Sequence, residues 1–362
     1  MAVGLPAKTT YANGDVFSAS DINDTNGTIN LIGQTTNFYA GKNKIINGDF
    51  GIWQRGTSIT CANNVATYVA DRFAVGAGYS SGSTVASRQT FTPGTAPVAG
   101  YEGSFFLRVT NAAGGSPSPY LDIAQRVEDV RVFAGQTVTL SFWAKASVST
   151  NLNPLIRQNF GSGGSSNVDS SPTAQTATTS WARYSFTLAI PSISGKTIGT
   201  SSYLEFYLLN GFYAANQTID IWGVQFEAGS TATAFQTATG TIQGELAACQ
   251  RYYYRTGVGT GSTTPRVYEP LGYGSFSGTT NFACQVEFPV SMRVAVNTLD
   301  YANIAVNDTA AVIAGTGIIV NEGGTKASNL NVTVASGGTQ YRFGRLVNNN
   351  STAGYLAWSA EL

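Results

Sequence analysis

The chain of 362 residues contains no histidine. This absence excludes Ser-His-Asp and Cys-His catalysis, histidine general bases, and most zinc and non-haem iron sites. Charged residues are also scarce, at 11% of the chain, where an ordinary soluble protein has roughly 25%. The 20 basic side chains balance the 20 acidic ones. A basic surface for nucleic acid or for an anionic membrane is therefore not expected.

Cysteine and long apolar runs are the next absences. Cys61, Cys249 and Cys284 lie far apart and are odd in number, so they suit neither a disulfide framework nor a CxxC site. We interpret them as small buried apolar residues of a protein made in a reducing cytosol. No apolar stretch approaches the ~18 residues of a membrane span, and no secretion signal is evident at the N-terminus. We expect a soluble protein with no membrane insertion.

What the chain does contain is enough apolar residues for large cores, at 43% of the total. Within Thr137–Lys145 the apolar residues alternate with polar ones, which is typical of a strand with one buried face. The same alternation recurs over 105–109, 182–188, 204–208, 282–288, 330–334 and 356–362. Loops rich in Gly, Ser and Asn, such as 111–117 and 161–167, separate these segments. The pattern predicts an all-β protein built from antiparallel sandwiches.

The composition divides the chain into four parts. Residues 1–40 are too polar to form a core and are expected to be an arm that orders against a partner. Residues 41–238 form a large β-sandwich, and residues 256–362 form a smaller C-terminal β-sandwich. Between them, residues 239–255 form a helical linker, in which Ile242, Leu246, Cys249 and Tyr253 are spaced to share one face of a short helix.

Four sequence blocks resemble a family of bacteriophage tail-fibre and related virion proteins. The first is Asn43–Thr57 (NKIINGDFGIWQRGT), which is followed by YVADRF at 68–73. AQRVE at 124–128 then leads into GQTVTLSFWAK at 135–145, IDIWGVQFEAGS spans 219–230, and ELAACQRYYY spans 245–254. The resemblance implies a homotrimeric fibre that attaches to other virion proteins through residues 1–40. It also implies synthesis in the host bacterial cytoplasm and release by lysis as part of the virion.

The large unit is also similar to the jelly-roll sandwiches of carbohydrate-binding modules. In those modules the opening strand and a late Asp help to hold a structural calcium ion, and the matching positions here are Asp49 and Asp220. Gly51 stands where the family has a further carboxylate, which leaves the set short of the six to eight oxygens that calcium takes. The alternative is that Asp49 and Asp220 accept hydrogen bonds in turns. No other cofactor is expected.

Glycan binding requires aromatic faces for stacking and amides or hydroxyls for orientation. Trp143, Tyr203 and Tyr207 lie on the strand faces opposite the apolar rows, and the loop 210–216 adds Phe212 and Tyr213. These five residues are the candidate ligand-binding residues. The alternative is that both faces of the sheet are buried in an oligomer.

Three other aromatic features are interpreted as packing. Trp53 and Trp222 are expected in the core. The cluster Tyr252–Arg255 follows the helix and is expected to pack against a sheet or a subunit, because tyrosine offers apolar area and a polar group together. A sticky patch for a receptor is the alternative interpretation of this cluster.

Degradation of a polysaccharide would need two carboxylates that face one cleft. Glu205, Glu102 and Glu227 are candidates, but nothing in the sequence pairs them, so no enzymatic activity is expected. The favoured function is that of a non-enzymatic virion fibre that binds a host surface glycan or receptor protein. A purely structural decoration or adaptor protein of the capsid or tail is one alternative, and a polysaccharide-degrading tailspike is the second.

Overall fold

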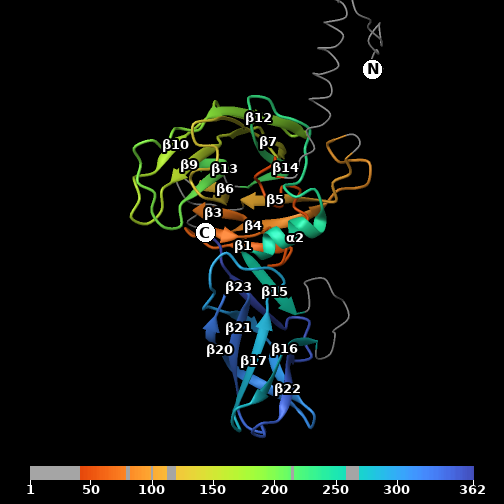
Figure 1. The fold of residues 1–362 in the computed structure, drawn as a ribbon. Helices are drawn as coiled ribbons and strands as arrows, with labels where there is room; N and C mark the ends of the chain where they lie inside the picture. The colour runs from red at the N-terminus through yellow and green to blue at the C-terminus, as the bar shows by residue number, and fades with distance from the viewer. Residues whose placement is uncertain (1–40, 79–81, 99–100, 112–119, 213–215, 258–268) are drawn as a thin grey trace, which may run out of the picture.

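The computed structural model describes residues 41–78, 82–98, 101–111, 120–212, 216–257 and 269–362. This part of the chain consists of β-strands and one nine-residue helix, α2 (Ile242–Gln250), which confirms the all-β prediction. No helix in these ranges is long and apolar enough to cross a membrane. Figure 1 shows a sandwich above a smaller barrel, with α2 and β15 at the junction between them.

The sandwich has two six-stranded sheets, and every strand pair within them is antiparallel. The first sheet has the order β1 (Ser58–Cys61), β4 (Thr84–Thr90), β5 (Phe105–Asn111), β14 (Gln217–Ala228), β7 (Thr137–Ala146) and β12 (Ala182–Ala189). The second has the order β10 (Val168–Ser170), β9 (Leu155–Asn159), β13 (Tyr203–Phe212), β6 (Tyr120–Glu128), β3 (Phe73–Gly78) and β2 (Thr67–Tyr68). A separate pair joins β8 (Thr150–Leu152) to β11 (Gln175–Ala177).

The main core lies between these two sheets. Phe206 of β13 and Phe226 of β14 meet across it with ring centroids 4.1 Å apart. Both rings are completely buried, as is Phe142 of β7. Burial of this apolar area supplies most of the stability of the sandwich.

The opening segment of the sandwich is held by two buried asparagines. The side chain of Asn43 donates to the carbonyl of Val224 and accepts from the backbone of Phe226, both in β14. Asn47 adopts a positive φ of 61° and bonds through its side chain to the backbone of Ile52. Both residues belong to the block 43–57, and their side chains tie this opening segment to β14 and to its own turn.

Helix α2 packs on this opening segment, but only Cys249 and Tyr253 of the predicted face are buried. Glu245 and Cys249 are buried, whereas Ile242 and Leu246 are 56% and 38% exposed. The carboxylate of Glu245 accepts hydrogen bonds from the backbone N–H of Asn47 and of Thr239, at 2.7 Å each. Glu245 therefore faces inward, where it satisfies two buried backbone donors. A pattern of apolar residues cannot predict that a charged side chain is buried.

The C-terminal unit is a closed six-stranded barrel rather than the expected two-sheet sandwich. Its strands close in the order β16 (Pro270–Phe276), β17 (Asn281–Glu287), β21 (Ala327–Val334), β20 (Val312–Gly323), β19 (Ile304–Asp308) and β22 (Phe343–Asn348). The register between β20 and β21 shifts twice, between Gly315 and Gly317 and between Val320 and Glu322. Such bulges bend a strand and increase its twist, which allows a small sheet to close on itself.

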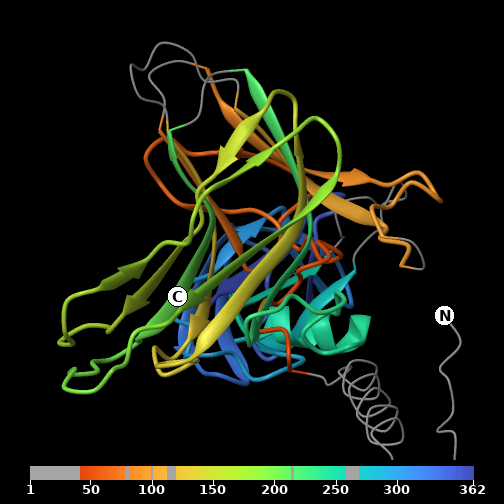
Figure 2. The ribbon, with the colours of Figure 1, turned by 90° about the horizontal axis from the view of Figure 1, so that it is seen from above.

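A three-stranded sheet joins the barrel to the sandwich. It has the order β15 (Tyr253–Gly257), β23 (Tyr355–Ser359) and β18 (Asp300–Ala302). Seen from above, the barrel lies beneath the sandwich, with α2 at one side (Figure 2). Tyr252 and Tyr253 are buried here, under the guanidinium groups of Arg72 and Arg55 at 3.4 and 3.6 Å from the ring centroids. This confirms the packing interpretation of the tyrosine cluster.

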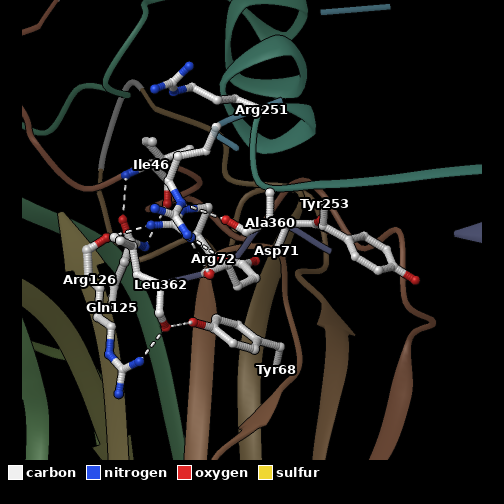
Figure 3. Close-up of polar contacts among 12 residues, drawn as sticks. Ile46, Tyr68, Asp71, Arg72, Gln125, Arg126, Arg251, Tyr253, Ala360 and Leu362 are labelled. Carbon is white, nitrogen blue, oxygen red and sulfur yellow. Dashed lines mark hydrogen bonds and ion pairs between the residues drawn. The ribbon is translucent and has the colours of Figure 1, made fainter. Parts of the chain in front are cut away.

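The residues after β23 contact the sandwich, and Figure 3 shows Leu362 beside Tyr68 and Arg126. Glu361 forms ion pairs with Arg55 and with Arg72, whose side chain is almost completely buried. The carbonyl oxygen of Leu362 accepts hydrogen bonds from Arg126 and from the hydroxyl of Tyr68 at 3.3 Å. Both donors belong to strands of the sandwich, so the C-terminal residues connect the barrel unit directly to the sheet β10-β9-β13-β6-β3-β2.

The remaining predictions about buried residues are confirmed. Cys61, Cys249 and Cys284 are all buried. Trp53 and Trp222 are 7% and 0% exposed. The predicted arm, residues 1–40, lies outside the described residues, and the predicted domain boundaries stay predictions.

Candidate functional site

A groove lies on the outer face of the sheet β10-β9-β13-β6-β3-β2. We call it the sheet groove; it is formed by strands β2, β3, β6 and β13 and has a volume of about 250 Å³. This is close to the lower end of the range for small-ligand sites, roughly 300–1,000 Å³. Three tyrosines line it, each from a different strand: Tyr68 of β2, Tyr120 of β6 and Tyr207 of β13.

Small residues form the floor of the sheet groove. Ala74 of β3 is paired with Ala124 of β6, which is in turn paired with Tyr207 of β13. Gly76 lies on the same face of β3 as Ala74 and also lines the groove. Because three neighbouring positions carry almost no side chain, the surface is hollowed beside the Tyr207 ring.

A hydrogen-bond network fixes the orientation of Tyr207. Its hydroxyl donates to Oε2 of Glu205 at 2.7 Å and accepts from Arg157 at 3.4 Å. Glu205 is 4% exposed, and its Oε1 accepts from Arg126 at 2.7 Å. Arg157 binds both oxygens of Asp169 at 2.8 Å. The two arginines are therefore neutralised by neighbouring carboxylates, and the tyrosine ring is held in place before any ligand arrives.

Asp122 is the second acid that lines the groove, and within the described part of the chain it forms no ion pair with an arginine. It lies on β6 opposite Gly76 of β3. Burial raises its pKa to about 6, and the neighbouring Glu205 adds to this rise, while a hydrogen bond from the backbone of Gly211 and the charge of Arg157 oppose it. Near pH 6 this side chain thus changes between a hydrogen-bond donor and a charged acceptor.

The structure brings two of the five predicted ligand-binding residues to this face. Tyr203 and Tyr207 are half-buried on the same face of β13, and the hydroxyl of Tyr203 accepts from Asn159 at 3.0 Å. Phe212 ends strand β13, and its side chain lies outside the described residues, as does Tyr213. The contact of these residues with a ligand stays a prediction.

The prediction for Trp143 is wrong. Its ring is 8% exposed and packs in a second core, with centroids 5.3 Å from Trp222 and 6.4 Å from Phe235. The guanidinium of Arg183 covers it at 4.6 Å. The segment that follows β14 folds back over the outer face of β7, so that the strand is buried on both faces and the ring cannot stack on a ligand.

The predicted calcium site is also wrong. Both oxygens of Asp220 accept from Arg108 at 2.7 Å, and Lys145 lies 3.6 Å away. The carboxylate that would bind calcium is therefore already paired with Arg108 and Lys145. Asp49 lies in a different hollow and accepts from the backbone of Gly51 at 3.3 Å. Within the described ranges no group of three or more acidic or cysteine side chains could hold a metal ion.

The three glutamates considered for hydrolysis lie in different environments. Glu227 is completely buried and accepts from Gln225 and Thr233. Glu102 accepts from the backbone of Gly94 at 3.1 Å, beside the hollow that Asp49 lines. Glu205 alone belongs to the sheet groove, and both of its oxygens are occupied.

Sequence reasoning missed Tyr68, Tyr120, Asp122 and Arg126 as parts of the groove. Each comes from a strand whose place beside β13 depends on pairing between distant segments. The alternation of Asp122, Ala124 and Arg126 along one strand indicates a shared face, but not that this face is open.

The comparisons with known proteins bear on the sandwich. Residues 86–207 match the family model described as a carbohydrate binding domain. This range covers about a third of the chain and includes Asp122, Arg126, Glu205 and Tyr207, but not Tyr68. None of the curated proteins matches the chain.

Similar solved structures include the CBM22-1 xylan-binding domain of Paenibacillus barcinonensis Xyn10C. It shares 13% identity with this chain and aligns over 53% of this chain and 98% of its own, with a TM-score of 0.30. A family 22 carbohydrate binding module of Clostridium thermocellum Xyn10B shares 16% identity over 48% of this chain and 99% of its own, with a TM-score of 0.30. Tailspike protein 4 of bacteriophage CBA120 shares 15% identity over 52% of this chain and 22% of its own, with a TM-score of 0.30. At these scores the similarities transfer no function, and the family match over residues 86–207 is the finding that bears on a ligand.

Proposed function

We propose that the sandwich binds a glycan in the sheet groove, without cleaving it. The observation that carries this proposal is the ring of Tyr207, which is held by Glu205 and Arg157 beside a floor of alanine and glycine. A rigid ring next to a shallow hollow suits a sugar ring, and the surrounding hydroxyls and carboxyls suit its hydroxyl groups. The match of residues 86–207 to a carbohydrate binding domain supports it.

The charges of the groove favour a neutral, hydroxyl-rich glycan. Arg126 and Arg157 are each paired with an acid at 2.7–2.8 Å, which leaves neither cation free for an anionic sugar. Asp122 would repel an anionic sugar above pH 6. A neutral glycan does not need a free cation and is not repelled by Asp122.

The biological setting that we propose is a bacteriophage virion fibre. It would attach to the particle through residues 1–40 and present the sandwich to a host surface glycan or receptor, as a homotrimer. The four sequence blocks shared with tail-fibre proteins support this setting. Three copies on one particle would raise the avidity of a weak site. Light scattering tests the assembly, since a trimer has three times the chain mass of 37.9 kDa.

Binding to a panel of neutral polysaccharides, including xylan and β-glucan, tests the site itself. Tyr207→Ala removes the ring and is expected to weaken binding at least about tenfold. Tyr207→Phe keeps the ring and is expected to retain most of the affinity. Tyr301→Ala, on the partly exposed strand β18, is the matched control for loss of a surface tyrosine. Equal binding by Tyr207→Ala and wild type, or release of reducing sugar from the polymers, would contradict the proposal.

A further inference from the structure

The outer wall of the barrel carries two open aromatic rings beside each other. Tyr273 of β16 and Phe343 of β22 are 57% and 60% exposed. Their ring planes differ by 15°, and their centroids lie 6.5 Å apart. A fully overlapped pair of rings would have closer centroids, so these two rings are offset and cover little of each other. Exposure of two large rings at one place on a barrel wall is uncommon unless it serves an interaction.

An arginine lies in the same row of side chains. Arg345 is paired with Tyr273 across the β16–β22 ladder, and it shares the outer face of β22 with Phe343 because the two are separated by one residue. On its other side it is paired with Asn307 of β19. Among the described residues, Arg345 forms no ion pair with an acid, whereas the neighbouring Arg342 is paired with Asp308 at 3.3 Å.

The surroundings of these three residues are polar, and they include one acid, the exposed Glu287 of β17, in the hollow that Tyr273 and Gln285 also line. Ser275 lies opposite Phe343, and Gln285 lies opposite Tyr273 on β17. A protein–protein interface would need a wider apolar core than two rings among hydroxyl and amide groups. These groups instead offer hydrogen-bond donors and acceptors of the kind that sugar hydroxyls use.

The turn before β22 adds a third exposed ring. Tyr341 is 81% exposed and has a φ of 67°, a region that bulky residues rarely occupy. The turn is held by hydrogen bonds from the backbone of Tyr341 to Phe276 and of Arg342 to Thr339. The fold thus keeps a tyrosine at the surface beside Phe343 at some cost in backbone energy.

We propose that Tyr273, Phe343 and Arg345 form a second binding site, for a saccharide that carries a negatively charged group. We call it the barrel platform. The two rings stack against the sugar rings, and the guanidinium of Arg345 pairs with a carboxylate, sulfate or phosphate of the same chain. The ligand class differs from that of the sheet groove, where every arginine already has an acidic partner.

Affinity electrophoresis of the full chain tests this proposal in gels that contain polygalacturonate, alginate or heparin, with dextran as the neutral reference. Wild type is expected to be retarded in at least one acidic polymer, and more strongly there than in dextran. Tyr273→Ala and Phe343→Ala are each expected to weaken this retardation at least about tenfold. Arg345→Gln is expected to weaken it and to remove most of its dependence on salt. All three residues are partly exposed, so these variants are expected to fold.

Two control variants distinguish the barrel platform from general surface stickiness and from the sheet groove. Ile319→Ser removes an aliphatic side chain that is 61% exposed on β20 and is expected to leave retardation unchanged. Tyr207→Ala disrupts the sheet groove and is also expected to leave it unchanged, so the two sites succeed or fail independently. Lack of retardation in all three acidic polymers would overturn the proposal, as would equal effects of Phe343→Ala and Ile319→Ser. Concentration-dependent association that Phe343→Ala abolishes would overturn it too, and would assign the surface to contact between copies of the chain.

Discussion

Asp122→Asn offers a sharp test of the electrostatics of the sheet groove. Burial raises the pKa of Asp122 from 3.8 to about 6 in the folded protein. Ionisation of Asp122 is therefore less favourable in the folded protein than in the unfolded chain, and this difference lowers the free energy of unfolding. A fully shielded carboxyl with this difference would lower stability by ~3 kcal/mol at pH 7. The groove is open to water, so we expect about 1–2 kcal/mol.

The sign follows from which state binds the proton. Well below pH 3.8 Asp122 is protonated in both states, so Asp122→Asn and wild type are expected to approach similar stability there. As the pH rises from 3.8 to about 6, the unfolded chain loses this proton first, and the wild type loses stability relative to the variant. At higher pH the difference is expected to stay constant. The asparagine can still accept the hydrogen bond from the backbone of Gly211.

Urea denaturation of both proteins at several values between about pH 3.5 and pH 8 measures this difference. Asp169→Asn is the control of opposite sign, because Arg157 lowers the pKa of Asp169. The Asp169 carboxylate stabilises the folded state above its unfolded pKa, so its replacement is expected to destabilise the protein at neutral pH and to have less effect in acid. A stability difference for Asp122→Asn that does not change with pH would refute the reasoning.

Three further substitutions test the fold that supports the site, and thermal or urea denaturation measures each of them. Trp143→Ala is expected to cost ~3–5 kcal/mol because the ring fills a second core; a loss of ligand binding at unchanged stability would contradict this. Glu361→Gln leaves the buried Arg72 with a weaker partner and is expected to cost up to ~3–5 kcal/mol, so a change of well under about 1 kcal/mol would count against a connecting role. Gly48→Ala would place a methyl group 2.2 Å from the carbonyl oxygen of Val224 and is expected to cost ~1–3 kcal/mol, whereas unaltered stability would show that the opening segment can move away from β14.

Local patterns in the sequence predict the strands well. The alternation around Val138, Leu140 and Phe142 identifies β7 because a strand repeats every two residues. The same alternation predicts an open face for Trp143, which is wrong. The segment that covers this ring follows β14, and the sequence of β7 gives no indication of it. Barrel closure likewise depends on register shifts in β20 that alternation cannot show.

The candidate site could be predicted in part. Tyr203 and Tyr207 lie on an outer face because they alternate with buried leucine and phenylalanine. Tyr68 and Asp122 join them through pairing of distant strands, and the sequence contains no sign of that pairing. Asp220 shows that residue type alone can mislead. An aspartate can bind calcium, but the carboxylate of Asp220 binds Arg108 on the neighbouring strand instead.

Glycan binding in the sheet groove is the central claim. Isothermal titration of wild type, Tyr207→Ala and Tyr207→Phe with an oligosaccharide of the neutral polymer that binds tightest tests this claim most directly. We expect wild type and Tyr207→Phe to bind one saccharide chain per groove and Tyr207→Ala to bind at least about tenfold more weakly. Indistinguishable isotherms for wild type and Tyr207→Ala would contradict the claim.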